Sequence, residues 1–201
     1  MFVRRKAQNG YRMLVQLYGS AAAKRHLWNT EFGGGRWKCL EDTAGDCIYP
    51  FVETHAHHGS ILDLGCGSGS TAVDLADASY TSYVGVDISD VALEHARARS
   101  ARNGRTAKNT FCQSDISTFT PNGQFDVILF RDSLCYIPRP RIVPVLHRYA
   151  QYLRPGAVFV LRLANGDEKY RAILTLVEKH FTIVERTSFF NPDAVVMVFR
   201  P

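Results

Sequence analysis

The chain has 201 residues, 46% of them hydrophobic and 21% charged, which is the composition of a globular protein with one substantial core. No apolar run approaches the roughly 20 residues that cross a bilayer, and no apolar segment follows the basic N-terminus as in a secretory signal. The five cysteines are odd in number and never spaced Cys-x-x-Cys, which argues against a disulfide scaffold and a zinc site. We therefore expect reduced thiols, a cytoplasmic location and no metal.

The net charge of +5 is unevenly distributed along the chain. Residues 1–38 carry a net charge of +7, and the remaining 163 residues sum to −2. A basic segment of this kind suits nucleic acid, an anionic membrane or an acidic substrate, or it is simply the solvated surface of a helix. Because the segment is short and lacks interleaved aromatic residues, we favour the solvated helix and expect neither a membrane nor a nucleic-acid partner.

Residues 1–58 predict a helical segment ahead of the first strand. One apolar helical face is formed at i, i+3, i+4 and i+7 by Tyr11, Leu14, Val15 and Tyr18. A second short helix is expected over residues 21–28, and a third over residues 48–56. Between them, residues 28–37 contain three consecutive glycines, which predict a flexible stretch without regular structure. We expect residues 1–58 to act as a lid and substrate-binding segment on a core of residues 59–201, within one structural domain.

Strands and helices alternate through the rest of the chain. Strands are expected at residues 61–64, 83–87, 110–112, 125–130, 157–163, 181–189 and 194–199. Helices are expected over residues 71–79, from the cap at Ser89 to near Gly104, after the prolines of residues 138–144 with Pro144 in the first turn, and after a cap at Asp167. Alternation predicts a parallel doubly wound sheet, and the two final strands predict an antiparallel pair at one edge.

Residues 61–70 form the most informative motif. Gly65, Gly67 and Gly69 follow a buried strand and precede a helix, so a ligand can approach the backbone of the turn closely. A dinucleotide fingerprint is Gly-x-Gly-x-x-Gly, whereas here the third glycine comes one residue sooner. Asp63 lies two positions before Gly65 and therefore beneath the turn. A carboxylate there repels a pyrophosphate and attracts an ammonium group, which favours a ligand with a cationic amine.

Residues 61–70 resemble the first motif of class I S-adenosylmethionine-dependent methyltransferases. The resemblance extends over roughly residues 60–200, through the acid Asp87 and residues 113–116, 125–133 and 152–156, all in the family's order. It implies an α/β fold: a Rossmann-like, doubly wound, mostly parallel seven-stranded sheet with an antiparallel C-terminal strand and an N-terminal helical lid. It also implies S-adenosyl-L-methionine as the cofactor, released as S-adenosyl-L-homocysteine.

The resemblance assigns most of the cofactor contacts. Asp87 matches the acid that binds both ribose hydroxyls, and Asp115 matches the residue that accepts a hydrogen bond from the adenine amino group. The full expected set is Asp63, Gly65, Gly67, Gly69, Asp87, Ile88, Asp115, Ile116 and Arg131, with the two isoleucines packing on the adenine ring. Alternatives stay open for the acids: Asp87 as a helix cap, Asp115 as turn chemistry, and Asp63 as a support for the loop amides.

The segment after the fourth strand predicts the wall that faces the methyl acceptor, because ligands bind beyond the carboxyl ends of such strands. Asp132 is the candidate general base or acceptor ligand, although a cap on a short turn explains it equally. Tyr136 is the second candidate catalytic residue, or packs without contacting substrate, and Ser133 lies between them. The Asn/Asp-Pro-Pro-(Tyr/Phe) signature of methyltransferases acting on nucleic-acid bases or protein glutamine is absent. The run from Arg131 to Tyr136 resembles methyltransferases of small metabolites.

Residues 28–37 are the predicted lid. Trp28, Phe32 and Trp37 are expected to shield the sulfonium of the cofactor, because aromatic faces attract cations. Arg36 is expected to pair with a carboxylate of the cofactor or substrate. The alternative is that the aromatic residues pin the N-terminal helices to the sheet.

These observations predict an enzyme that moves a methyl group to an oxygen or nitrogen of a small-molecule acceptor, such as a metabolite, sugar or natural product. Three alternatives remain open. The first is a tRNA or rRNA methyltransferase that uses the basic N-terminal arm. The second is a non-catalytic protein that binds S-adenosylmethionine, and the third is a nicotinamide dehydrogenase. We expect a monomer or a homodimer.

Overall fold

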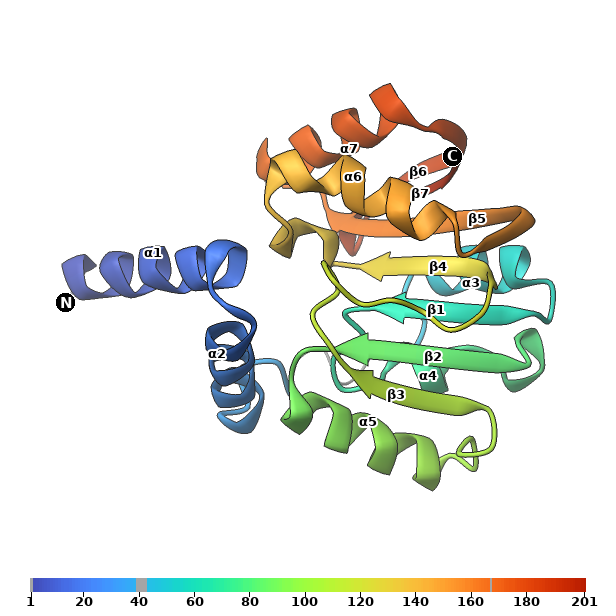
Figure 1. The fold of residues 1–201 in the computed structure, drawn as a ribbon, viewed down its shortest axis with the longest axis horizontal. Helices are drawn as coiled ribbons and strands as arrows, with labels where there is room; N and C mark the ends of the chain where they lie inside the picture. The colour runs from blue at the N-terminus through green and yellow to red at the C-terminus, as the bar shows by residue number, and fades with distance from the viewer. Residues whose placement is uncertain (1, 39–42, 167) are drawn as a thin grey trace.

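A computed structural model describes residues 2–38, 43–166 and 168–201. One seven-stranded sheet runs through it in the order β3-β2-β1-β4-β5-β7-β6 (Figure 1). The strands are β1 (Ser60–Leu64), β2 (Ser82–Asp87), β3 (Asn109–Gln113), β4 (Phe125–Arg131), β5 (Leu153–Ala164), β6 (Thr182–Phe190) and β7 (Asp193–Arg200). Strands β1 to β5 pair in parallel, and β7 is antiparallel to both β5 and β6. The predicted fold class is confirmed.

Helices cover both faces of this sheet. They are α1 (Phe2–Tyr18), α2 (Ala21–Gly33), α3 (Tyr49–Ala56), α4 (Thr71–Asp74), α5 (Asp90–Arg102), α6 (Arg139–Ala150) and α7 (Glu168–His180), with short 3-10 helices η2 (Asp77–Ser79) and η3 (Leu134–Tyr136). Helices α6 and α7 lie on one face and α3 on the other (Figure 1). The sheet is therefore buried on both sides, which is why its central strands are almost wholly apolar.

The alternation of side chains along each strand divides the core into two halves. Leu62 of β1 lies beside Ile128 of β4, and both pack in the half beneath α6 and α7. Their chain neighbours Ile61 and Val127 point to the opposite half, beneath α3. This two-residue period fixes the register, because a slip of one residue would exchange the two faces.

Helix α2 is longer than the sequence predicts, because it continues through the first of the three glycines. Gly34 ends the helix with its backbone N–H donated to Thr30, and the N–H of Arg36 reaches the carbonyl of Glu31. The glycines therefore form a helix C-terminus and a turn, in the role that glycine commonly has there. The expectation of a stretch without regular structure from Trp28 onward is wrong.

Two other helix predictions need correction. The helix after the glycine turn ends at Asp74 and not at Ser79, because Leu75 is extended and the N–H of Ala76 donates to Glu53 Oε1 at 2.6 Å. Pro144 lies inside α6 and not in its first turn. The cost of its missing hydrogen bond is offset by the buried face of this helix, which consists of Ile142, Val145, Leu146 and Tyr149. The expected cap at Asp167 lies outside the described residues.

Helix α1 confirms the predicted helix but not a buried apolar face. Tyr11, Leu14 and Tyr18 are 70%, 61% and 69% exposed, whereas Gln16 on the other side is 5% exposed. Figure 1 shows the reason: α1 extends away from the sheet and meets the rest of the molecule at α2. Arg12 pairs with Glu31 across that contact.

The carboxyl ends of β1, β2, β3 and β4 meet at one edge of the sheet, and α2 lies across this edge (Figure 1). The glycine turn, the acid at the end of β2 and the segment after β4 are all located here. This edge therefore brings together residues that lie far apart in the sequence.

Candidate functional site

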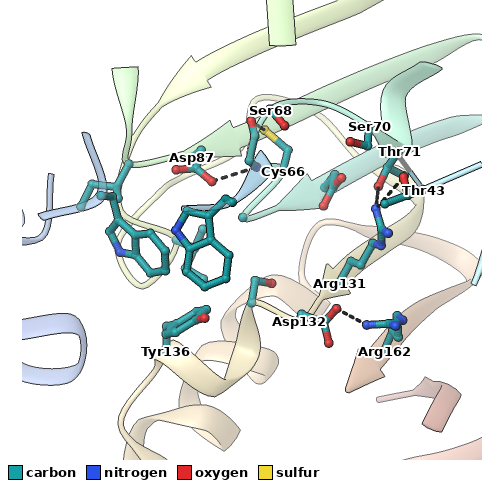
Figure 2. Close-up of a pocket in the computed structure, with 18 of the residues that line it drawn as sticks. Thr43, Cys66, Ser68, Ser70, Thr71, Asp87, Arg131, Asp132, Tyr136 and Arg162 are labelled. Atoms are coloured by element: carbon teal, nitrogen blue, oxygen red, sulfur yellow. Dashed lines mark hydrogen bonds and ion pairs between the residues drawn. The ribbon is translucent and has the colours of Figure 1, made fainter. Parts of the chain in front are cut away.

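A cavity of about 510 Å³ opens at the carboxyl edge of the sheet. The glycine turn, the ends of β2, β3 and β4, helix α2 and the segment before α3 contribute to its wall. Fourteen of the predicted site residues line it: Trp28, Phe32, Trp37, Asp63, Gly65, Gly67, Asp87, Ile88, Asp115, Ile116, Arg131, Asp132, Ser133 and Tyr136. Gly69 and Arg36 do not line it. Figure 2 shows this cavity and its polar side chains.

The glycine turn is tied to the end of β2. The backbone N–H groups of Gly65 and Cys66 donate to the carbonyl of Val86 at 2.7 and 3.1 Å. Gly65 has a φ of +89°, and a Cβ on it would lie 2.4 Å from the Cβ of Ser133. Only glycine therefore fits between the first strand and the segment after β4.

Gly69 has a packing role that the sequence prediction missed. Its φ is +75°, and a Cβ would lie 2.7 Å from the Cβ of Ala96 on α5. The close approach of α5 to the sheet therefore depends on Gly69. The structure places this third glycine against a helix, in contrast to the cofactor contact expected of it.

Asp87 joins the glycine turn to α5. One carboxylate oxygen accepts the N–H of Gly67 and the other accepts the N–H of Ser89, each at 2.9 Å. Ser89 in turn caps α5 by accepting the N–H of Ala92. Burial raises the pKa of Asp87, and the backbone hydrogen bonds oppose that shift. Ser89 and not Asp87 is therefore the cap of α5, and Asp87 holds the cap residue in place and lines the cavity.

Asp63 lies almost completely buried beneath the turn. Its Oδ2 accepts a hydrogen bond from the hydroxyl of Tyr83, whereas its Oδ1 has no hydrogen-bond partner among the described residues. Burial raises the pKa of Asp63 to about 6, against the lowering effects of Tyr83 and Arg131. A buried carboxylate oxygen without a partner at a cavity wall is an acceptor available to a ligand.

Asp115 is paired with a residue that the sequence prediction missed. Lys24 of α2 places its Nζ 3.0 Å from Asp115 Oδ2, and both side chains are mostly buried. The other oxygen, Oδ1, accepts the backbone N–H and the hydroxyl of Ser117. These bonds lower the pKa of Asp115 despite its burial. No local pattern singles out Lys24, because it is 91 residues from its partner.

A row of alternating charges forms the side of the cavity opposite Asp87 (Figure 2). Arg131 Nη2 lies 2.6 Å from Asp46 Oδ2, and Arg162 Nε lies 3.4 Å from Asp46 Oδ1. Arg162 also pairs with Asp132. The backbone of Asp132 is left-handed, with a φ of +53°. Burial raises the pKa of Asp132, although Arg162 and Arg131 lower it. The sequence prediction missed Asp46 and Arg162; the only signal is an arginine in the otherwise apolar strand at residues 157–163.

Aromatic side chains close the cavity. Trp28 meets Tyr136 edge to face with ring centroids 4.9 Å apart, and it lies 5.6 Å from Trp37. Phe32 is placed over the glycine turn, since a Cβ on Gly67 would lie 3.5 Å from its ring. Arg36 is exposed and outside the cavity, so the structure does not bring it to the acceptor wall.

Unpartnered polar atoms gather at this cavity. Five buried side-chain atoms of its wall have no hydrogen-bond partner in the described part of the chain: Gln16 Nε2, Asp63 Oδ1, Arg131 Nε, Ser133 Oγ and Arg162 Nε. Buried polar groups are normally hydrogen-bonded, so such a cluster fits a polar ligand. The acceptor at Asp63 and the donor on Arg131 suit the ammonium and carboxylate ends of an amino acid, and Asp87 suits a diol.

The strand order, the glycine turn above Asp63 and the acid at the end of β2 define a class I methyltransferase fold. A family model described as "Methyltransferase domain" matches residues 61–156. Over these residues the chain is similar to the class I S-adenosylmethionine-dependent methyltransferases. In the part of the chain that the structure describes, no helix is long and apolar enough to cross a membrane.

Curated relatives have different acceptors in their names. A 2-heptyl-1-hydroxyquinolin-4(1H)-one methyltransferase of Mycobacteroides abscessus is 34% identical over 119 residues, which are 57% of this chain and 50% of that protein. A trans-aconitate 2-methyltransferase of Deinococcus radiodurans is 32% identical over 127 residues, which are 62% of this chain and 45% of that protein. The chain thus spans about half the length of the curated relatives it matches.

Solved structures share the fold. A magnesium protoporphyrin IX methyltransferase from Synechocystis with bound S-adenosyl-L-homocysteine has a TM-score of 0.69 at 17% identity, covering 90% of this chain and all of that chain. The N-methyltransferase NodS from Bradyrhizobium japonicum, also with S-adenosyl-L-homocysteine, has a TM-score of 0.61 at 18% identity, covering 82% and 97%.

Proposed function

We propose that this protein binds S-adenosyl-L-methionine in the cavity and transfers the methyl group to an oxygen or nitrogen of a small molecule. The observation that carries the proposal is the single cavity that joins the glycine turn and its acids to an aromatic and charged wall. Its volume of about 510 Å³ is in the range of small-molecule sites. The relatives' names, which include a hydroxyquinolinone and aconitate, support a small acceptor.

The residues of the glycine turn and strand ends hold the cofactor in this proposal. Asp87 takes the ribose diol, and Asp115 takes the adenine amino group next to Ile88 and Ile116. Asp63 Oδ1 accepts from the ammonium group of the methionine moiety, and the Arg131 guanidinium faces its carboxylate. A bound S-adenosylmethionine supplies a methyl group that is already activated by a sulfonium.

The protein's own contribution is mainly positioning and exclusion of water. Helix α2 lies across the carboxyl edge of the sheet, and its aromatic residues close the cavity toward Tyr136. Residues 1–58 therefore serve as the lid and substrate-binding segment in our proposal, with residues 59–201 as the core. Asp132 and Tyr136 face the acceptor.

Isothermal titration calorimetry with S-adenosyl-L-homocysteine tests the proposal. We expect saturable binding at a one-to-one ratio that Asp87→Ala weakens about 100-fold, because two charge-assisted hydrogen bonds and the ribose contact are lost. Glu178→Ala is the matched control: it removes an exposed carboxylate that pairs with Arg186 outside the cavity. Absence of heat with S-adenosyl-L-homocysteine, together with binding of NADH, would establish a dinucleotide enzyme.

The remaining alternatives are separated by two further measurements. Salt-dependent binding of tRNA, together with transfer of labelled methyl groups to it, would favour a nucleic-acid substrate acting through the basic α1 and α2. Cofactor binding without release of S-adenosyl-L-homocysteine across a panel of hydroxy and amino compounds would favour a non-catalytic binding protein. The proposal expects release with a small molecule and none with RNA.

A further inference from the structure

We propose that the acceptor is a planar aromatic compound with a hydroxyl group. Its ring lies against the aromatic wall of Trp28, Trp37 and Tyr136, and Asp132 accepts its hydroxyl proton. This inference rests on the proposed function and names the substrate class of the same cavity. The aromatic wall selects the flat ring, and the carboxylate of Asp132 selects the hydroxyl group.

The aromatic wall is held in place before any ligand arrives. The indole N–H of Trp37 donates to Glu31 Oε2 at 3.0 Å, and the Arg12 guanidinium lies 5.5 Å from the Trp37 ring centroid. Trp28 is held between Trp37 and Tyr136. Flat, rigid rings lose little conformational entropy on binding and offer broad faces for stacking. Such a wall selects a flat, apolar ligand body.

Asp132 is the carboxylate that an acceptor contacts on the charged side of the cavity, next to Arg162. Its backbone N–H donates to the Arg162 carbonyl at 3.0 Å, and its φ of +53° turns the chain sharply after β4. Oδ2 pairs with Arg162. The side chain is 36% exposed and lines the cavity. One oxygen is therefore anchored, and the carboxylate is accessible from the cavity.

Arg162 acts as a positioning residue for Asp132. Its guanidinium lies between Asp132 and Asp46, and Asp46 is in turn held by Arg131. The row has two positive and two negative groups, so it is neutral as a whole. Burial nevertheless raises the pKa of Asp132, which makes this carboxylate a better proton acceptor than an exposed aspartate.

The charges select a neutral hydroxyl over other acceptor groups. Because the row is neutral as a whole, it offers no net attraction to a carboxylate or an ammonium group at this position. A phenolic hydroxyl has a pKa of about 10, far below that of an alkyl alcohol, so its proton moves to a carboxylate at a smaller cost. The nearby guanidinium groups stabilise the negative charge that develops on the oxygen.

Asp132 takes up the one proton that the acceptor loses during methyl transfer. The hydroxyl proton passes to Asp132 as the oxygen lone pair forms the bond to the methyl carbon and the methyl–sulfur bond breaks. The products are an aryl methyl ether, a neutral thioether and a protonated Asp132, which then loses its proton to water. No metal or further co-reactant is required.

Three matched probes test the inference on protein saturated with S-adenosyl-L-homocysteine. The probes are 2-naphthol, naphthalene without the hydroxyl, and 2-decalol, which keeps the hydroxyl on a saturated ring system. Calorimetry is expected to show 2-naphthol binding about tenfold more tightly than naphthalene, because a hydrogen bond to a charged group contributes about that factor. 2-Naphthol should also bind more tightly than 2-decalol, which has no flat ring to stack on the aromatic wall. Trp28→Leu is expected to weaken 2-naphthol and naphthalene equally.

Substitutions at Asp132 separate binding from proton transfer. Asp132→Ala is expected to reduce the preference for 2-naphthol over naphthalene to less than about twofold. Asp132→Asn retains a hydrogen-bonding group but cannot take up the proton, so it binds 2-naphthol and loses at least about 100-fold in release of S-adenosyl-L-homocysteine from 2-naphthol and S-adenosyl-L-methionine. Arg162→Met is expected to change the pH dependence of S-adenosyl-L-homocysteine release, because it removes the partner of Asp132, and Arg162→Lys, which keeps a positive charge there, is expected to change it less. Glu178→Gln is the surface control.

The outcomes distinguish this inference from the proposed function. One outcome is a protein that binds S-adenosyl-L-homocysteine but binds 2-naphthol no more tightly than naphthalene, or does not bind 2-naphthol at all. This outcome would overturn the aromatic-hydroxyl inference and leave the proposed function intact. Equal turnover of Asp132→Asn and the unaltered protein would overturn the role of Asp132. A protein that does not bind S-adenosyl-L-homocysteine contradicts the proposed function itself.

Discussion

Lys24 Nζ lies 3.0 Å from Asp115 Oδ2, so helix α2 is bound directly to the turn where the adenine site is proposed. Farther along the same helix, Arg25 pairs with Asp90 at 2.6 Å, and Asn29 accepts the Ser89 hydroxyl. Helix α2 is thus fastened along the cofactor side by polar contacts, whereas its aromatic residues face Tyr136. Helix α2 therefore borders the cavity through two different kinds of contact.

Lys24→Met is expected to increase the dissociation rate of S-adenosyl-L-homocysteine about five- to tenfold. The substitution keeps most of the side-chain length but removes a mostly buried, charge-assisted hydrogen bond that holds α2 closed. Stopped-flow measurements of the dissociation rate check this prediction. Because the pair is mostly buried, added salt should screen it little and leave the ratio of the two rates nearly unchanged. Arg25→Met, at the more exposed pair with Asp90, is the comparison and should have a smaller effect.

Two glycines of the turn are expected to respond differently to alanine. Gly69→Ala places a Cβ 2.7 Å from Ala96 and strains a positive φ, so it should lower the free energy of unfolding by about 2–5 kcal/mol. Gly67→Ala meets only the Phe32 ring at 3.5 Å and should cost about 1–2 kcal/mol, mainly from its φ of +52°.

Thermal unfolding and calorimetry with S-adenosyl-L-homocysteine are the two measurements for this pair. Because Gly67 lines the cavity and Gly69 does not, Gly67→Ala should weaken the binding of S-adenosyl-L-homocysteine more than Gly69→Ala does. Gly69→Ala should lower the Tm more than Gly67→Ala does. A larger fall in Tm for Gly67→Ala would show that the packing role has been assigned to the wrong glycine.

Asp63 predicts a pH dependence of both stability and binding. Its pKa is raised to about 6 by burial, so the native state holds this proton more tightly than the unfolded chain, where an aspartate titrates near 4. Asp63 should therefore destabilise the native state as pH rises from about 4 to about 6, by roughly 2–3 kcal/mol in total. Chemical denaturation at several pH values measures this effect, and the free energy of unfolding of Asp63→Asn should lack this pH-dependent contribution. The same dependence of that free energy on pH in both proteins would contradict the prediction.

The ammonium group of S-adenosyl-L-homocysteine favours the ionised Asp63. Binding should consequently become stronger as pH rises through about 6 and release a proton below that pH. Calorimetry at pH 5.5 in two buffers with different ionisation enthalpies measures the released proton directly. The same titration of Asp63→Asn is the control, and it should show a smaller release.

Asp87 and Asp132 are expected to act on different kinetic parameters. Asp87→Ala should weaken cofactor binding severely, because Asp87 holds the N–H of Gly67 as well as facing the cavity. Asp132→Ala should lower kcat while cofactor affinity changes less than about twofold. Equal losses of cofactor affinity in the two variants would place the acceptor wall elsewhere.

Much of the fold could be predicted from local patterns. The apolar runs of β1 and β4 indicate central parallel strands, and the glycines after Leu64 indicate a turn that opens a helix. The position of Asp87 at the end of the next strand follows from the same alternation. At two places where these predictions failed, a tertiary contact overruled the local preference. Glu53 ends the helix after the turn at Asp74, and the packing of α6 retains Pro144 in its interior.

The sequence by itself determined the fold class, because the glycine turn, the acid beneath it and the order of strands and helices are all encoded in short segments. Tertiary structure alone decided how the cavity is closed and charged. Lys24 meets Asp115 over 91 residues, and Arg131 meets Asp46 over 85. Such partners share no periodicity or spacing, since the energy of an ion pair depends on distance in space and not along the chain.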